Sequence, residues 1–479
     1  MIINSRKIEV MKFRNVGFVV MTLLLALGVC QGQMLERRPN VLIILLDDAG
    51  YNDFGFMGSS DIATPNIDAL ASKGVVFNDG HTTSSVGSPS RAAILTGRYG
   101  QRWGFESSMR EPYGLNTVVK TMAEVFQADG YKTVAIGKWD LGTAPEYHPN
   151  ERGFDEFYGF LGGSRSYFAN SKDDAATSPQ SMLQHNGKHV STKEYLTYEF
   201  GHKAEEYVAQ SGSTPLFIYL AFNAVHTPME ATKADLARFK DHPRQRLAAM
   251  TYALDEAIGS VVKKLDKEGK LDNTLIFFLS DNGGAHDNES SNEPLKGGRG
   301  SKFEGGHRVP FFVVFGEKLM RGTTYDPMVS SLDIFATAIA AAGIEYDNFR
   351  ESLDGVNLIP YLNGEELSEE LSEVPHEALY WRKNDAKALR YGEYKLITVE
   401  GVGEALYNLA DNPYEDENMA MDSTSQRDML ESLFTTWERE LITPARWGEG
   451  EWEAVTTQMH RELIENLEPK TFTPEDLKE

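Results

Sequence analysis

Uninterrupted apolar runs recur along the first two-thirds of the chain, with helix-like patterns between them. Residues 40–46 (NVLIILL), 215–222 (PLFIYLAF) and 274–280 (TLIFFLS) are apolar at almost every position. Runs without a polar face are typical of strands that are buried on both sides of a sheet. Residues 117–130 and 246–269 show helical spacing instead. The alternation predicts an α/β fold with a large, mostly parallel sheet flanked by helices.

The pattern changes after about Arg350. Turn residues separate short alternating segments there, EALYWRK, ALRYGEYKLIT and EALYNLA. Such segments predict a small antiparallel sheet. The last stretch, from about Ile442, is polar and acidic and predicts a helix and tail around this second unit. We therefore predict a main domain at residues 38–350 and a C-terminal subdomain with a tail at residues 351–479.

The charge balance narrows the choice of partners. The 479 residues include 71 Asp and Glu against 47 Lys and Arg, so the formal net charge is −24. An acidic surface repels polyanions, although salt screens the repulsion beyond roughly 8 Å. We expect no nucleic-acid partner. An anionic small molecule or glycan can still bind where basic residues gather in a pocket.

The N-terminal segment predicts export. Basic residues precede an apolar run at residues 17–29, and small and polar residues follow it. This order is typical of a signal peptide, which we place at residues 1–32, with Met11 as an alternative start. The run is shorter than the roughly 20 residues of a membrane span. We expect a periplasmic or extracellular protein without a stable membrane span, and an N-terminal anchor helix is the alternative.

Cys30 is the only cysteine, and it lies inside or beside this segment. The mature chain therefore has no disulfides, no thiolate metal site and no cysteine nucleophile. Lipid attachment at Cys30 is disfavoured, because Val29 before it fits such a signal poorly.

Two acidic pairs stand at the ends of predicted strands. Asp47 and Asp48 follow the first strand, and Asp281 and Asn282 follow the run at residues 274–280. Oxygen ligands that converge at one edge of a sheet suit Ca²⁺ or Mg²⁺. One pair alone would more often cap a loop or form a turn. The two pairs together predict a metal site, although their spacing does not show that they meet.

Several motifs follow one another in a fixed order from about Pro39 to Ala420. They are PNVLIILLDDAGYNDFG, TPNIDALASKGVVFNDGHTT, SPSRAAILTGRYG, GKWDLG, RGFDEFYGFLGG, LSDNGG, EGGHRVPF, DGVNLIPYLNG, RYGEYKL and LYNLADNPYEDENMA. In this order the chain resembles the formylglycine-type sulfatase family of the alkaline phosphatase superfamily. The resemblance implies an alkaline-phosphatase-like α/β fold with a smaller C-terminal domain on a four-stranded sheet. By analogy with exported bacterial members, it implies sulfated polysaccharides or oligosaccharides as substrates.

The resemblance also implies roles for individual residues. The metal, Ca²⁺ or Mg²⁺, would be held by Asp47, Asp48, Asp281 and Asn282. Arg91 would support the nucleophile and the metal, Lys138 would bind the sulfate, and His226 would contact the sulfate on the leaving-group side. Outside the family frame, Lys138 could simply end a strand and His226 could be a loop histidine.

The nucleophile position departs from the family signature. The family has Cys or Ser, any residue, and then Pro-Ser-Arg, and the Cys or Ser is oxidised to formylglycine. Here the stretch is VGSPSRAAILTG, which puts Gly87 at that position. Glycine has no side chain to oxidise. Ser85 is two residues too early and Ser88 one residue too late.

Two further positions differ. The family's GKWHLG is GKWDLG here, so Asp140 replaces a histidine that resembles a general base. The ordinary pKa of Asp is about 3.9, against about 6.5 for His. The family's GGKG is GGRG, so Arg299 replaces a sulfate-binding lysine. Arginine keeps the charge but has a planar fork. Lys302, three residues on, is a candidate to compensate.

Three functions remain open. The first is a folded, metal-binding sulfatase relative with absent, weak or unconventional catalysis, which binds a sulfated glycan or a partner enzyme. The second is an active sulfate-ester hydrolase that uses a water held by the metal, or in which Gly87 is a misreading. The third is a phosphate- or phosphonate-ester hydrolase. We expect residues 165–193 and 288–294 to select the substrate.

Overall fold

The computed structural model describes residues 38–107, 113–168, 180–345, 349, 352–383, 385–443 and 450–478. The chain divides into Met1–Arg38 and a compact unit from Pro39 to Glu479, to which the features below belong. The predicted signal peptide at residues 1–32 lies outside the described residues. Within the described part, no helix combines the length and the apolar character that a membrane crossing requires.

A ten-stranded sheet forms the centre of the described chain, in the order β11-β2-β10-β9-β1-β8-β4-β5-β6-β7. Five neighbouring strands in its middle run parallel. They are β9 (Thr274–Ser280), β1 (Asn40–Leu46), β8 (Leu216–Ala221), β4 (Lys132–Lys138) and β5 (Glu156–Phe160). The apolar runs of the sequence are these strands, because both of their faces are covered. The predicted α/β fold is confirmed.

The outer strands depart from the parallel arrangement. β10 (Phe311–Val314) runs antiparallel to β9. The remaining strands at the two edges are short. They are β2 (Val75–Phe77), β11 (Thr323–Tyr325), β6 (Gln184–His185) and β7 (Lys188–His189).

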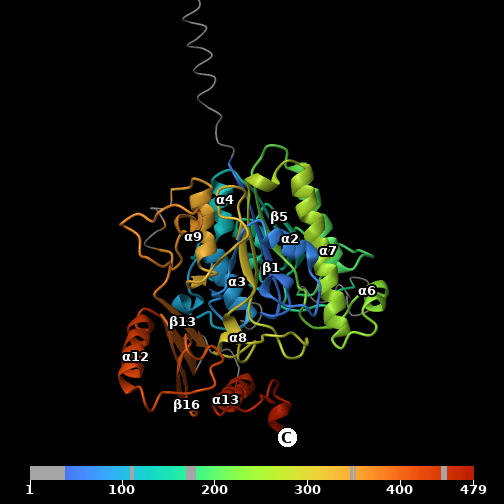
Figure 1. The fold of residues 1–479 in the computed structure, drawn as a ribbon. Helices are drawn as coiled ribbons and strands as arrows, with labels where there is room; N and C mark the ends of the chain where they lie inside the picture. Colours follow the sequence, from blue (N-terminus) through green and yellow to red (C-terminus); the bar gives the residue numbers. More distant parts are fainter. Residues whose placement is uncertain are drawn as a thin grey trace, which may run out of the picture. The chain divides into compact units, whose positions relative to one another are not determined.

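Helices cover both faces of the sheet (Figure 1). Alternate residues of β1 divide between two hydrophobic clusters, as a strand of period two requires. One face carries α2 (Pro65–Ala71), α5 (Leu196–Gln210) and α7 (Gln245–Lys267). The other carries α3 (Gly87–Thr96), α4 (Met122–Ala128) and α9 (Asp333–Ala341).

Helix α4 is shorter than the helical pattern at residues 117–130 predicts. The Thr121 hydroxyl accepts a hydrogen bond from the Glu124 backbone N–H at 3.1 Å. The Glu124 carboxylate in turn accepts one from the Thr121 backbone N–H at 2.6 Å. This reciprocal capping box fixes the start of the helix at Met122.

The C-terminal part contains the predicted four-stranded antiparallel sheet, β13 (Ala378–Lys383), β14 (Ala386–Tyr391), β15 (Tyr394–Val399) and β16 (Gly403–Asn408). Its two faces belong to different hydrophobic clusters. Helix α12 (Thr424–Glu438) contributes to one cluster, and α13 (Gly450–Ile464) to the other. The helix predicted for the acidic last stretch is α13.

A buried ion network joins this small sheet to the main domain. Lys395 of β15 is fully buried, and its ammonium lies 2.8 Å from Glu304 Oε1 and 2.9 Å from Glu415 Oε1. Glu304 begins α8 (Glu304–His307), a short helix after the β9 strand end. Burial raises the pKa of Glu415 to about 7, against the attraction of Lys395. Burial alone would also raise the pKa of Glu304, but Lys395 and its other cationic neighbours hold it well below its usual range.

Replacing the shared cation should destabilise the fold. Lys395→Met leaves two buried carboxylates without their ammonium, which typically costs about 3–5 kcal/mol of unfolding free energy. Urea unfolding followed by tryptophan fluorescence measures the change. Lys387→Met is the matched control, because Lys387 is 33% exposed beside Glu438 and such pairs are worth about 0–1 kcal/mol. If the two variants lost the same free energy of unfolding, the stabilising role of the buried network would be contradicted.

Candidate functional site

Four oxygen-bearing residues meet where β1 and β9 end. The two strands are parallel neighbours with Leu46 opposite Ser280, so the residues that follow them emerge side by side. The Asp48 backbone N–H donates to Asp281 Oδ1 at 3.2 Å, and Asn282 Nδ2 donates to Asp48 Oδ1 at 2.7 Å. Asp47 lies at the same edge, and all four side chains are buried. The two acidic pairs of the sequence therefore meet in space.

Two buried cations face these carboxylates. Arg91 of α3 approaches Asp281 Oδ2 with Nε and Nη2, each at 2.8 Å, and Asp47 Oδ1 at 3.5 Å. Lys138, the last residue of β4, donates to Asp47 Oδ2 at 2.7 Å. Burial alone would lower the pKa of Arg91, but Asp281 and Asp47 raise it above its usual range. Burial also raises the pKa of Asp281, and Arg91 opposes that rise.

Two more basic side chains approach Asp48. His226 Nε2 lies 3.7 Å and Arg299 Nη1 3.2 Å from Asp48 Oδ2. His226 Nδ1 lies 2.6 Å from the carbonyl oxygen of Thr227, which can only accept. We therefore assign the Nδ1 proton to that bond, which leaves Nε2 toward Asp48. Asp48 raises the pKa of Arg299, whose side chain is 37% exposed and stands at the mouth of the site.

Asp140 joins the cluster through Lys138. One carboxylate oxygen, Asp140 Oδ2, lies 3.9 Å from Lys138 Nζ. The same oxygen accepts a 2.7 Å hydrogen bond from the Ser88 hydroxyl. The sequence set Ser88 aside because it is out of register with the signature. Its contact with Asp140 depends on how α3 faces β4, which no motif encodes.

Gly87 is the first residue of α3, after Val86 as N-cap. A Cβ built on Gly87 would lie 2.7 Å from Asp281 Oδ2 and 3.6 Å from Asn282 Oδ1. The first distance is shorter than real contacts allow, and Arg91 holds that Asp281 oxygen in place. A side chain at position 87 therefore requires the Asp281 carboxylate to move.

The oxygen cluster fits a divalent cation. Ligand atoms of Asp47, Asp48 and His226 all lie within 4.8 Å of one another. Among the described residues, Asn282 Oδ1 is buried and has no hydrogen-bond partner, so a free acceptor points into the site. Carboxylate and amide oxygens are the donors that Ca²⁺ and Mg²⁺ prefer. His226, which the resemblance placed near the sulfate, also lies within reach of such an ion.

A second group of ligating side chains, His81, Glu304 and His307, is buried at the ion network. The Lys395 ammonium lies 2.8 Å from Glu304 Oε1 and 3.2 Å from His307 Nε2. A protein cation therefore already balances this group, and we assign no metal there.

Nine of the ten predicted site residues form one connected cluster through the contacts given above, in which Asp140 joins through Lys138. The tenth, Gly87, lies beside them, where an added Cβ would meet Asp281 and Asn282. The ten residues are Asp47, Asp48, Gly87, Arg91, Lys138, Asp140, His226, Asp281, Asn282 and Arg299.

Lys302 was a candidate to replace the family's sulfate-binding lysine, but its ammonium does not lie at the strand-end cluster. Its ammonium donates to Ser85 Oγ at 3.2 Å, and the side chain is buried. Within the described chain it forms no ion pair with the strand-end carboxylates. Burial lowers the pKa of Lys302 to about 7, with nearby Lys383 adding to the effect.

One residue of each predicted selecting segment fixes the backbone behind the cluster. Asn288 is buried and donates to the carbonyl oxygens of Asp48 and Val225, at 2.9 and 3.0 Å. It therefore fixes the backbone behind the cluster. Tyr167 does the same from the other segment, because its hydroxyl lies 2.7 Å from the His226 carbonyl oxygen. Neither residue carries a motif that sequence alone could have identified.

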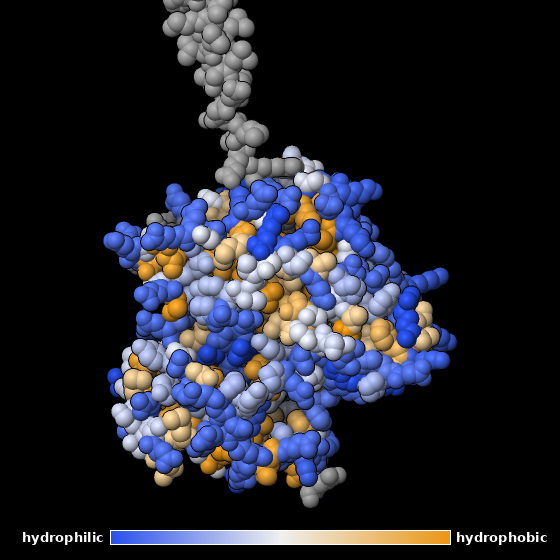
Figure 2. Space-filling view, in the orientation of Figure 1, coloured by the Kyte–Doolittle hydropathy of each residue, from blue (hydrophilic) through white to orange (hydrophobic). Residues whose placement is uncertain are grey.

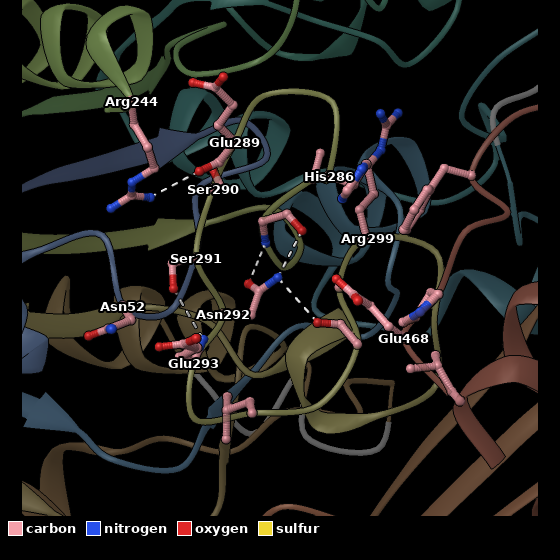
Figure 3. Close-up of a pocket in the computed structure, with 18 of the residues that line it drawn as sticks. Asn52, Arg244, His286, Glu289, Ser290, Ser291, Asn292, Glu293, Arg299 and Glu468 are labelled. Carbon is pink, nitrogen blue, oxygen red and sulfur yellow. Dashed lines mark hydrogen bonds between the residues drawn. The ribbon is translucent and has the colours of Figure 1, made fainter. Parts of the chain in front are cut away.

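A cleft of about 850 Å³ adjoins the cluster at Arg299. Arg299 and Glu468 lie at one side of it, and Arg244 and Asn52 at the other (Figure 3). The Asn292 amide holds the loop between them, because it accepts from the Gly284 N–H at 2.8 Å and donates to the Gly284 carbonyl at 2.9 Å. This cleft leads from the cluster to solvent.

Comparisons with known proteins agree on one family. The sulfatase family model matches residues 39–344. Human N-acetylgalactosamine-6-sulfatase is 31% identical over 386 residues, which cover 75% of this chain and 71% of that protein. The uncharacterized sulfatase YdeN of Escherichia coli K12 is 30% identical over 402 residues, 72% of this chain and 69% of that protein.

Solved structures give the same result. The crystal structure of Ps i-CgsB has a TM-score of 0.80 and 34% identity, and the match covers 88% of this chain and 96% of that chain. The crystal structure of Ps i-CgsB in complex with k-i-k-neocarrahexaose has a TM-score of 0.79, at the same identity and coverage.

The buried Lys302 should make stability depend on pH. An unfolded lysine keeps its proton up to about pH 10.4, whereas Lys302 in the fold keeps it only below about 7. The unfolded chain then binds more protons between these values, so the free energy of unfolding falls as the pH drops from about 10 to 7. Lys302→Met should gain stability relative to the native chain over that range. Urea unfolding at several pH values tests this, and a difference that does not change with pH would contradict it.

Proposed function

Because this chain belongs to the sulfatase family, we propose that it binds sulfate esters of polysaccharides or oligosaccharides but cannot hydrolyse them through formylglycine. The observation that carries the proposal is Gly87. It begins α3 inside the cluster of carboxylates and cations, in register with the family's signature motif. We also propose that residues 1–32 direct export to the periplasm or the exterior, where such glycans occur.

The charges around the cluster favour an anionic ligand once a metal is bound. The three carboxylates of Asp47, Asp48 and Asp281 are balanced by the cations Arg91, Lys138 and Arg299. A divalent cation would add two positive charges to this set. Asp140 offsets one of them, and the single negative charge of a sulfate monoester can offset the other. Backbone N–H groups at the start of α3 add further attraction for anionic oxygen.

Turnover by the family route lacks its nucleophile here. An aldehyde hydrate needs a side-chain carbon, and glycine has none. Asp140 stands where the family has a histidine, and it accepts a bond from Ser88. Loss of a nucleophile costs several orders of magnitude in rate, because each factor of ten corresponds to about 1.4 kcal/mol of barrier.

We propose Ca²⁺ as the metal, held by Asp47, Asp48, Asp281 and Asn282. Supplied with Ca²⁺ at 100 times its dissociation constant, the native chain should gain about 2.7 kcal/mol of unfolding free energy. Asp48→Asn, which keeps the shape and removes a charge, should lose most of this Ca²⁺-dependent gain. Thermal unfolding with Ca²⁺, Mg²⁺ or chelator measures it. Asp61→Asn is the control, since Asp61 is 43% exposed in the neighbouring cleft and pairs with Arg244. A native chain that is indifferent to both ions would contradict the metal site.

Restoring the missing side chain should restore chemistry. Gly87→Cys, expressed with a maturing enzyme and combined with Asp140→His, should hydrolyse an aryl sulfate orders of magnitude faster than the native chain. Gly87→Cys alone should gain much less, because Asp140 keeps its bond to Ser88. Ser88→Cys is the matched control, one residue out of register, and should stay inactive. Mass spectrometry checks oxidation of residue 87 independently of activity.

A sulfate-ester hydrolase is the second candidate, favoured by the contact between Ser88 and Asp140. A hydroxyl bonded to a carboxylate has the geometry of a nucleophile and its base. The Ser88 oxygen would bond to sulfur while the ester S–O bond breaks. Its proton would pass through Asp140 to the leaving alcohol, and water would later release sulfate from Ser88. Robust turnover by the native chain that Ser88→Ala abolishes would overturn the first proposal in favour of this one.

A further inference from the structure

We propose that the glycan lies along a groove that passes over Arg299, and that Trp452 of α13 binds the sugar ring next to the sulfated one. The inference rests on the proposed function for the position of the sulfate. It adds a second binding site, built by a C-terminal helix outside the region that the family model matches.

The groove consists of two clefts that meet at Arg299. The larger has about 850 Å³ (Figure 3), and the smaller about 340 Å³. Both are lined by Ala285, His286, Arg299, Met459 and Phe472. Because Arg299 Nη1 also lies 3.2 Å from Asp48 Oδ2, a sulfate bound at the cluster would lie next to both clefts.

The smaller cleft combines an aromatic wall with a direct path to the cluster. Val86, the residue before Gly87, lines it from the main domain. Trp452 lines it from α13 and is 51% exposed, whereas Val455 behind it is buried. On the surface shown in Figure 2, hydrophobic residues form only small groups. A large aromatic side chain is usually more buried than Trp452 is. An exposed ring in the wall of a largely apolar cleft that also carries Arg299 and Lys383 suits a ligand with both an apolar face and anionic groups, and a sulfated pyranose ring has both.

An aromatic pair, separate from Trp452, holds another part of the cleft lining in place. His286 stacks on Phe472, with ring centroids 3.9 Å apart and an angle of 5° between the rings. His286 follows the β9 strand end, and Phe472 lies in the C-terminal tail. The stack therefore fixes the tail against the loop that follows the strand-end acids. A preformed wall lowers the entropy that binding costs.

The charges of the two clefts set the direction of a sulfated chain. The larger cleft carries four acidic residues, Asp61, Glu289, Glu293 and Glu468. Its Arg244 is already paired with Asp53 and Asp61. Arg299 belongs to both clefts, and the smaller one adds Lys383 against a single acidic residue, Asp287. Further sulfates therefore fit toward Trp452, and the larger cleft favours uncharged sugars.

A sulfated oligosaccharide is the occupant that these observations favour. The smaller cleft opens at Arg299, the cation that would hold the sulfate, and Trp452 supplies an exposed aromatic ring in its wall. A solved relative at 34% identity holds k-i-k-neocarrahexaose. A sulfated glycan would use both the anion site at Arg299 and the smaller cleft that continues from it. A peptide or a lipid would not need these two sites to be continuous.

The test measures binding, so it does not depend on turnover. The full chain with Ca²⁺ is titrated calorimetrically with inorganic sulfate, and with carrageenan and chondroitin sulfate oligosaccharides of two, four and six sugars. We expect affinity to rise with length for at least one series. Trp452→Ala should weaken the best hexasaccharide at least tenfold and leave inorganic sulfate unchanged, whereas Trp452→Phe should keep part of the gain. Met429→Ala on α12, 42% exposed and outside both clefts, is the control.

Each outcome has a distinct meaning. If neither sulfate nor any glycan binds, the proposed function fails. If inorganic sulfate binds but no hexasaccharide binds more tightly, or if Trp452→Ala binds the hexasaccharide like the native chain, the groove proposal is overturned and the anion site stands. Glu468→Lys tests the direction. It should not improve hexasaccharide binding, and a tenfold gain would place the sulfated chain in the larger cleft.

Discussion

The site depends on two parallel strands that end at the same level. Because β1 and β9 pair in register, the residues after them are forced together, and three carboxylates converge in a buried space. Such a concentration of negative charge is tolerable only with compensation. Arg91 and Lys138 supply it from α3 and β4, so the helix that begins at Gly87 is held against the strand ends by ion pairs. The position of Gly87 beside Asp281 follows from this arrangement.

Much of the main domain could be predicted from the sequence, because its central strands are buried on both faces and carry no polar pattern. The acidic pairs could be placed at one edge of the sheet, because the carboxyl ends of parallel strands lie at the same edge. The exact ends of the helices were harder to predict from the sequence. The capping box of Thr121 with Glu124 determines where α4 begins, and it overrides a helical pattern that starts earlier.

Contacts between distant segments were beyond prediction. Ser88 and Asp140 lie 52 positions apart, and their bond depends on the rotation of α3 relative to β4. The Lys302 side chain contacts Ser85 because the loop before α8 packs against the loop before α3. The cleft walls of α13 and Phe472 come from a segment that predicted a helix and tail around the second unit, but not the contact of Phe472 with His286. In each case the sequence contains the residue but not the packing that gives it a role.

The crowding at Gly87 limits what this position can accept. At an uncrowded position, a glycine can be replaced without any change in its neighbours. Here the Asp281 carboxylate, fixed by Arg91, stands where the new Cβ would be, and Asp140 has taken a partner in Ser88. A side chain introduced at position 87 alone would therefore meet surroundings that fit glycine. Larger residues become acceptable only together with a shift of the Asp281 carboxylate, so the ion pair of Asp281 with Arg91 restricts which residues position 87 can carry.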